Sequence, residues 1–156
     1  MTTEQEERLA VVQAAVSWLG TPYMGNQGVK GSGVDCGFLL LRTFQEARII
    51  EEAIDPGYYS QQWHMHKREE RYLNWVLKYA HEIPSPPENI PLPGDIIMFK
   101  FGLVYAHGAV VTNYPMIIHV KNVGMARVME DNVVQNCVGK YALANVPKRY
   151  FSVWPR

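Results

Sequence analysis

The chain has 156 residues, 47% of them apolar, and its 15 basic side chains equal its 15 acidic ones. This length and composition favour one compact domain with its own hydrophobic core, and we expect residues 1–156 to form it. Because positive charge is not in excess, binding to nucleic acid or to an anionic membrane surface is not expected.

The N-terminal segment carries glutamates where a signal peptide needs basic residues, and no apolar run follows them. No stretch approaches the roughly 18 apolar residues of a membrane span. We therefore expect synthesis in the cytoplasm without a signal peptide, and no membrane insertion. Cys36 and Cys137 are expected to be free thiols, since a domain of this size can bury a core without disulfides.

The first predicted helix begins at a capping box formed by Thr3 and Glu6 and ends before Gly20. Its apolar residues recur at helical spacing and should face the core: they are Leu9, Val12, Val16 and Leu19.

Two more helices are predicted in the first half of the chain. A glycine-rich loop over 21–34 leads to a largely buried helix that starts at Cys36, after Asp35, and runs to Ala47. A third helix is indicated by Tyr72, Leu73, Val76, Leu77 and Ala80.

After a proline-rich connection over 84–93, the apolar residues alternate with a period of two. This pattern predicts strands at 95–101, 105–112, 116–121, 125–129 and 150–154. Short connections favour antiparallel pairing. We therefore expect an α+β domain, with N-terminal helices packed on a mainly antiparallel sheet of about five strands.

Cys36 is placed where a cysteine can become a nucleophile. A helix N-terminus and a nearby imidazolium are the usual means of lowering the pKa of a thiol. The backbone N–H groups of the first turn also point to where an oxyanion would form. Cys137 has no such setting, and we interpret it as a small, partly buried residue.

Two histidines on predicted strands could assist Cys36, although a single histidine in a strand is more often structural. If residues 113–115 form a hairpin loop, Thr112 faces Met116. His107 and His119 then lie on one sheet face, about 7 Å apart at Cα. One imidazole could hydrogen-bond the other, which is the base-and-orienter arrangement of a Cys-His-X triad.

Five blocks of the sequence, in order, resemble the NlpC family of papain-like cell-wall cysteine peptidases. They are Gly-Thr-Pro-Tyr at 20–23, Gly-Val-Asp-Cys at 33–36, Pro-Gly-Asp-Ile at 93–96, His-Gly-Ala-Val-Val at 107–111 and Ile-His at 118–119. The resemblance spans residues 9–127. It implies a papain-like fold and a cysteine that attacks a peptidoglycan stem peptide, commonly between D-glutamate and diaminopimelate.

The resemblance also implies roles for individual residues. Cys36 would be the nucleophile, His107 its base and His119 the residue that orients this base. Tyr23 would help to form the oxyanion site, although it could equally be a packed aromatic residue. We place Gly37, Asp35 and His66 beside it as oxyanion- or substrate-binding residues.

The usual family text is Asp-Cys-Ser-Gly, and here Gly37 and Phe38 replace the serine and glycine. This variant, with the segments at 63–66 and 69–73, looks most like the phage tail-associated branch. That branch would imply tail proteins as partners and action on the cell wall from outside.

No metal or cofactor is expected. His64 and His66 could share one face of an extended segment, but a zinc site needs three or four ligands and no further Cys or His cluster supplies them. Three other functions remain open: an N-acetylmuramoyl-alanine amidase on the same scaffold, a non-catalytic tail assembly protein, and a protease acting on protein substrates.

Overall fold

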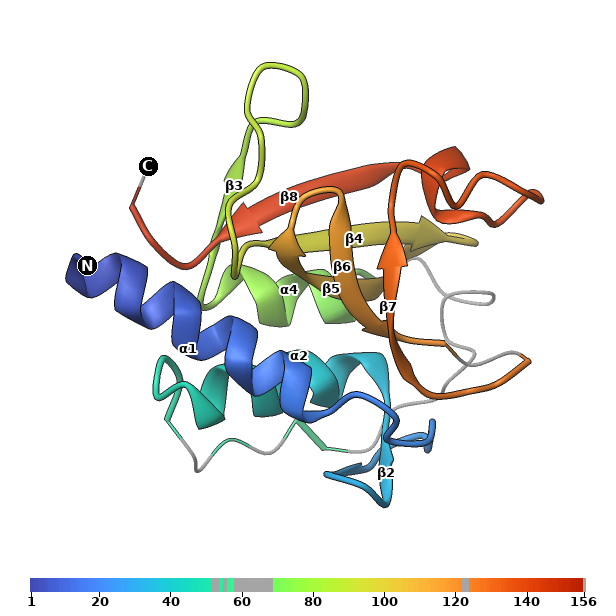
Figure 1. Ribbon diagram of the computed structural model, residues 1–156. Coiled ribbons are helices and arrows are strands. Elements are labelled where there is room, and N and C mark those ends of the chain that lie inside the picture. The colour runs from blue at the N-terminus through green and yellow to red at the C-terminus, as the bar shows by residue number, and fades with distance from the viewer. Residues whose placement is uncertain (52–53, 55, 58–68, 122–123, 156) are drawn as a thin grey trace.

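The structure is a computed structural model, and it describes residues 1–51, 54, 56–57, 69–121 and 124–155. Three helices lie on one side of it (Figure 1): α1 at Thr3–Ser17, α2 at Cys36–Glu46 and α4 at Arg71–Leu77. Within the described residues, no helix is long and apolar enough to cross a membrane.

A six-stranded antiparallel sheet packs against these helices, in the order β3-β8-β4-β5-β6-β7. Its strands are β3 at His81–Ile83, β4 at Ile96–Phe101, β5 at Val104–Asn113, β6 at Met116–Val120, β7 at Val128–Asn132 and β8 at Lys148–Ser152. A two-stranded sheet joins β1 at Gly28–Val29 to β2 at Gly33–Val34, and a short 3₁₀ helix, η1, covers Leu143–Asn145. The predicted α+β architecture is confirmed.

The sheet is buried on both faces. One face, which includes Met98, Val110 and Ile118, packs against the helices in a shared apolar cluster. The other face, which includes Phe99 and Val111, packs against the chain between Val133 and Val146. This two-sided burial explains the nearly continuous apolar sequence of β4 and β6.

Two strand boundaries were wrong, and the three short strands β1, β2 and β3 were missed. The strand expected at 125–129 is Val128–Asn132, and the one expected at 150–154 is Lys148–Ser152. Pairing with β6 starts β7 at Val128 and carries it through polar residues that an apolar pattern does not include. Strand β3 has only three residues, two of them exposed, so it left no alternation to detect.

The predicted buried face of α1 was also wrong. Leu9, Val16 and Leu19 are 43%, 44% and 40% exposed. The helix buries a different set instead: Arg8, Val11, Ala14 and Ala15, followed by Trp18 just beyond its end. The capping box is one residue earlier than predicted, since Thr2 is the N-cap and pairs reciprocally with Gln5.

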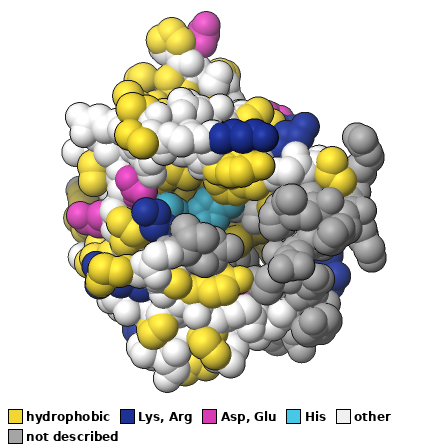
Figure 2. All heavy atoms as spheres, turned by 90° about the vertical axis from the view of Figure 1, so that its right-hand side faces the viewer, with side chains coloured by type: hydrophobic (Ala, Val, Ile, Leu, Met, Phe, Trp, Pro, Cys, Tyr) yellow, Lys and Arg dark blue, Asp and Glu magenta, His cyan; other side chains and the backbone are white. Residues whose placement is uncertain are grey.

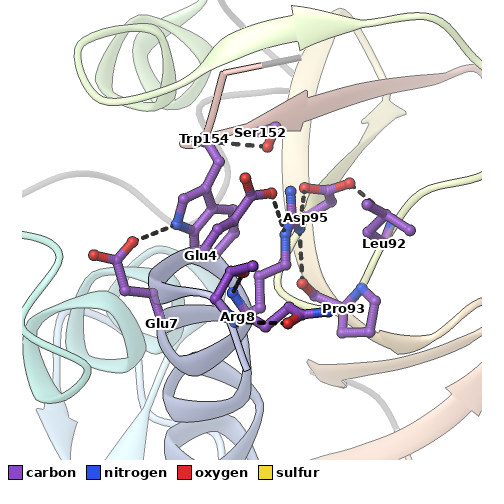
Figure 3. A network of polar contacts seen from close by, with 10 residues as sticks. Glu4, Glu7, Arg8, Leu92, Pro93, Asp95, Ser152 and Trp154 are labelled. Carbon is purple, nitrogen blue, oxygen red and sulfur yellow. Dashed lines mark hydrogen bonds and ion pairs between the residues drawn. The ribbon is translucent and has the colours of Figure 1, made fainter.

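Arg8 fixes the rotation of α1 (Figure 3). It is 6% exposed, and its Nη1 donates to Asp95 Oδ1 at 2.9 Å and to the Pro93 carbonyl at 2.8 Å. Its Nε donates to Glu4 at 2.9 Å. A charge buried this deeply needs such partners. The face of α1 that carries Arg8 is therefore the buried one, and the longer apolar side chains are left exposed.

The same cluster holds the C-terminal end of the chain. The guanidinium of Arg8 lies 4.1 Å from the ring centre of Trp154, whose Nε1 donates to Glu7 at 2.7 Å. Gly94 has φ +89°, and a Cβ there would come within 2.8 Å of the Trp154 ring. The Pro-Gly-Asp block therefore joins the first helix to the last strand.

Candidate active site

Cys36 is the first residue of α2, as the sequence predicted. Asp35 caps this helix: its Oδ1 accepts a hydrogen bond from the Phe38 N–H at 2.9 Å, and its Oδ2 accepts one from the Asn26 N–H at 2.6 Å. Asp35 is 1% exposed and turns its carboxylate toward backbone donors. Its observed contacts are thus those of a helix cap that sets the position of Cys36.

Beside Cys36, β5 is not paired with β6. Strand β5 begins at Val104, but its pairs with β6 are Val110 with Ile118, Val111 with Ile117 and Asn113 with Met116. In the half of β5 that β6 does not pair with, the Cys36 thiol donates to the Ala106 carbonyl at 3.5 Å.

Ala106 is the extra residue of a β-bulge. On β4, Phe99 pairs with His107 and Lys100 pairs with Tyr105, so Ala106 has no opposite residue. Such bulges bend a strand and change the direction of neighbouring side chains. Here the bulge directly precedes His107.

His107 on β5 and His119 on β6 are in contact with each other. His107 Nε2 lies 2.8 Å from His119 Nδ1, and the two rings are nearly perpendicular, at 76°. The predicted register is confirmed by the pairs Val110 with Ile118 and Val111 with Ile117. It shifts at the end of the hairpin, where Asn113 rather than Thr112 faces Met116, and the connection is the two residues 114–115.

Asp131 on β7 extends this chain of contacts. Its Oδ2 lies 3.0 Å from His119 Nε2 and accepts from Asn136 Nδ2 at 3.0 Å, while Oδ1 accepts from the Asn132 N–H at 2.8 Å. These hydrogen bonds lower the pKa of Asp131 below its ordinary value, although the side chain is partly buried. The hydrogen bond from His119 has the largest effect. Asp131 therefore stays ionised.

The Asp131 carboxylate determines which nitrogens of His119 and His107 carry protons. An ionised carboxylate only accepts hydrogen bonds, so His119 Nε2 carries a proton, and in the tautomer with one ring proton Nδ1 accepts. His107 Nε2 must then be the donor to His119 Nδ1. This leaves His107 Nδ1 without a proton, as a base requires.

Sequence reasoning missed Asp131. In the β6–β7 register His119 pairs with Met129, so Asp131, two residues on, lies on the same face as His119. A strand predicted to end at 129 could not show this. The acidic residues at 130–131 were the sequence feature that could have indicated Asp131, had the strand been extended to include them.

The thiol and the base are both uncharged at neutral pH. Burial, followed by the nearby Asp35 carboxylate, raises the pKa of Cys36 to about 12, although backbone N–H groups of Gly108, Gly37 and Cys36 itself act in the opposite direction. Burial, followed by the proximity of His119, lowers the pKa of His107 well below its ordinary value. The N–H groups at the start of α2 thus lower the pKa of Cys36 as expected, but burial outweighs them.

Two tyrosines lie beside Cys36. Burial, with smaller contributions from Cys36 and Asp35, raises the pKa of Tyr23 to about 12, so its hydroxyl keeps its proton and can donate. The hydroxyl of Tyr72, on α4, donates to the Cys36 carbonyl at 2.8 Å. Tyr72 was predicted only as part of an apolar helix face.

These groups line one cleft of about 710 Å³. Its described lining includes five of the predicted site residues, namely Tyr23, Cys36, Gly37, His107 and His119. Residues of α4 and residues between 136 and 143 also contribute to the lining. Figure 2 looks onto this face and shows imidazoles in a hollow bordered by hydrophobic and basic side chains.

Asp35 is not among the described residues that line the cleft. His66, like His64, lies outside the described residues. Within the part of the chain that is described, no group of three or more His, Cys, Asp or Glu side chains could hold a metal ion.

Comparison by sequence identifies no relative: no protein-family model matches the chain, and no curated protein does either. Solved structures do share its fold. NlpC1 from Trichomonas vaginalis matches with a TM-score of 0.60 and 16% identity over 97% of this chain, which spans 44% of that longer protein.

Two mycobacterial structures are similar in the same way. The peptidoglycan hydrolase RipB from Mycobacterium tuberculosis has a TM-score of 0.62 and 14% identity, over all of this chain and 70% of its own. RipD from the same organism is described as a non-catalytic NlpC/p60 domain protein adapted to peptidoglycan binding. It has a TM-score of 0.56 and 14% identity, over 95% of this chain and 98% of its own. At such identities these likenesses establish the fold alone.

Proposed function

We propose that the chain is a cysteine peptidase that cleaves an amide bond in the stem peptide of peptidoglycan, most specifically the bond between D-glutamate and diaminopimelate. The observation that carries this proposal is the Cys36 thiol in one cleft with the relay from His107 through His119 to Asp131. The fold, shared with a peptidoglycan hydrolase such as RipB, supports the choice of substrate.

In the proposed reaction, His107 Nδ1 takes the thiol proton as Cys36 Sγ attacks the scissile carbonyl carbon. The Cys36 N–H and the Tyr23 hydroxyl donate to the resulting oxyanion. Collapse of the tetrahedral intermediate breaks the C–N bond, and the leaving amine takes the proton from His107. Water, deprotonated by His107, then hydrolyses the thioester to a carboxylic acid and the free thiol.

His119 and Asp131 act through His107 in this scheme. When His107 takes up a proton, its imidazolium still donates from Nε2 to His119. The Asp131 carboxylate, one imidazole away, favours this positive charge. Because thiol and imidazole start uncharged, the proton moves during attack rather than beforehand.

Purified protein incubated with bacterial sacculi tests the proposal. We expect soluble muropeptides whose new termini, identified by mass spectrometry, are the γ-carboxyl group of D-glutamate and the amine of diaminopimelate. Cys36→Ala should abolish their release, whereas Cys137→Ala, a matched change at an exposed cysteine, should not. Equal release by Cys36→Ala would contradict the nucleophile assignment. A new terminus at the lactyl group would identify an amidase.

The likeness to RipD favours a second candidate, a non-catalytic domain that binds peptidoglycan. It would bind sacculi without releasing fragments, and Cys36→Ala would leave binding unchanged. Association with a phage tail, and action on the wall from outside, rest on the Asp-Cys-Gly variant at 35–37 and stay predictions. Co-sedimentation with tail proteins would test them.

A further inference from the structure

The described lining of the cleft is positively charged, although the chain as a whole is neutral. Three cations, Arg71, Lys121 and Lys140, contribute to this lining, and no described lining residue is an aspartate or glutamate. A cleft with charge of one sign attracts ligand groups of the opposite sign.

Three carboxylates near the site, Asp35, Glu70 and Asp131, are not among the described lining residues, and each has hydrogen-bond donors of its own. Asp35 accepts backbone hydrogen bonds as a helix cap. Both oxygens of Glu70 lie 3.2 Å from the Tyr105 N–H. Asp131 accepts from His119 and Asn136.

Two of the cations form no ion pair with any carboxylate that the structure describes. In the described part of the chain, neither Lys121 nor Lys140 forms an ion pair with a carboxylate, whereas Arg71 is already engaged within the protein. The two lysines are therefore available to bind an anionic ligand group.

Both lysines line the same cleft as Cys36. Lys121 follows His119 by two residues, a spacing that puts side chains on one face of an extended strand, and its backbone N–H bonds the Arg127 carbonyl at 3.1 Å. Lys140 belongs to the lining segment between Asn136 and Leu143, and its ammonium lies 5.4 Å from the Tyr141 ring centre.

We propose that Lys121 and Lys140 form a carboxylate-binding site at the mouth of the cleft. This inference rests on the proposed function. The site selects stem peptides whose carboxylates beside the scissile bond are free, over those in which they are amidated. An amidated peptide offers the ammonium groups no charge, and leaves them without the ion pair that a carboxylate supplies.

A double-mutant cycle on binding tests this selection. The probes are the tripeptide L-alanyl-γ-D-glutamyl-diaminopimelate with a free glutamate α-carboxylate and the same tripeptide with that group as a carboxamide. Binding is measured by calorimetry with Cys36→Ala, so that neither probe is cut. We expect amidation to weaken binding about threefold or more, as for an exposed ion pair.

Removal of the lysines should remove this difference. In Lys121→Gln/Lys140→Gln, made in the Cys36→Ala chain, both probes should bind with the weaker affinity of the amide. The matched control is Lys30→Gln, which removes one positive charge outside the cleft, next to Glu46. It should keep the preference for the free carboxylate.

Three results would overturn the carboxylate site: equal binding of the two probes to the Cys36→Ala chain, no binding of either, or an unchanged preference in the double lysine variant. The proposed function is judged separately, by cleavage with Cys36 intact. Cleavage without carboxylate preference would reject the lysine site alone. Preference without cleavage of either probe or of sacculi would reject the peptidase alone.

Discussion

Asp131 determines which nitrogen of each histidine carries a proton. Because the carboxylate accepts from His119 Nε2, the neutral rings are aligned so that His107 Nδ1 is free to act as a base. An amide at position 131 could instead donate to His119 Nε2. Both rings would then take the opposite tautomer, and His107 Nδ1 would already hold a proton.

We therefore expect Asp131→Asn to lower kcat/KM for the stem peptide by about 100-fold or more, as when a triad carboxylate is replaced. Because Asp131 does not line the cleft, KM should change little. Steady-state kinetics on the free-carboxylate tripeptide would measure both. Glu130→Gln, at the exposed neighbouring position, is the control and should keep wild-type kinetics. Wild-type kcat/KM in Asp131→Asn would contradict the relay.

Individual site residues could be predicted from the sequence where a side chain interrupts a pattern. Cys36 at a helix start and His119 within an apolar strand both do so, and their places were predicted correctly. Asp131 and the Tyr72 hydroxyl depend on contacts between elements distant in the chain, which no local pattern records. The raised pKa of Cys36 likewise follows from burial by the assembled fold.

The approach of α2 to β5 sets the distance between the thiol and the base. Gly108 permits this approach, since a Cβ there would come within 2.6 Å of Tyr72 Oη and 2.8 Å of Leu40 Cδ1. Tyr72 in turn donates to the Cys36 carbonyl. One glycine on the strand and one hydroxyl from α4 thus hold the first turn of α2 beside His107.

We expect Gly108→Ala to push these elements apart and to lower kcat/KM at least tenfold, at a cost in stability of about 1–3 kcal/mol, typical of overpacking. Tyr72→Phe removes the closest clashing atom. The double variant Gly108→Ala/Tyr72→Phe should therefore be more active than Gly108→Ala alone. Kinetics and denaturant unfolding of the two single variants and the double variant would measure the coupling. Purely additive losses would show that the two positions act independently.

The elements themselves were largely predictable, but their orientations were not. The register of β5 and β6 followed from the assumed hairpin loop at 113–115, and the pairs Val110 with Ile118 and Val111 with Ile117 agree with it. The rotation of α1 was predicted wrongly, because it is decided by the pairing of Arg8 with a residue 87 positions away. The predicted single domain over 1–156 stays a prediction.

At the scale of the whole molecule, the cluster around Arg8 joins the two ends of the chain. Arg8 links α1 to the Pro-Gly-Asp turn, and Trp154 links the segment after β8 to Glu7. Asp95 is fully buried, so loss of Arg8 would leave an uncompensated charge in the interior.

Arg8→Met should therefore destabilise the protein by about 3–5 kcal/mol, in the range for breaking one side of a buried ion pair. Urea unfolding followed by tryptophan fluorescence would measure this. Arg149→Met, which breaks the exposed pair with Glu82, is the control and should cost about 1 kcal/mol or less. Replacing Asp95 as well, in Arg8→Met/Asp95→Asn, should recover part of the loss. Equal costs for the two arginines would contradict this account.

The position of the two termini also determines how the protein can be attached to a surface or fused to a partner. Both termini lie on the left of Figure 1, whereas Figure 2 views the right-hand side, where the imidazoles are visible in their hollow. A bead, a tether or a fused partner at either end would therefore project away from the cleft. A large insoluble polymer could still approach Cys36 while the protein is held from behind.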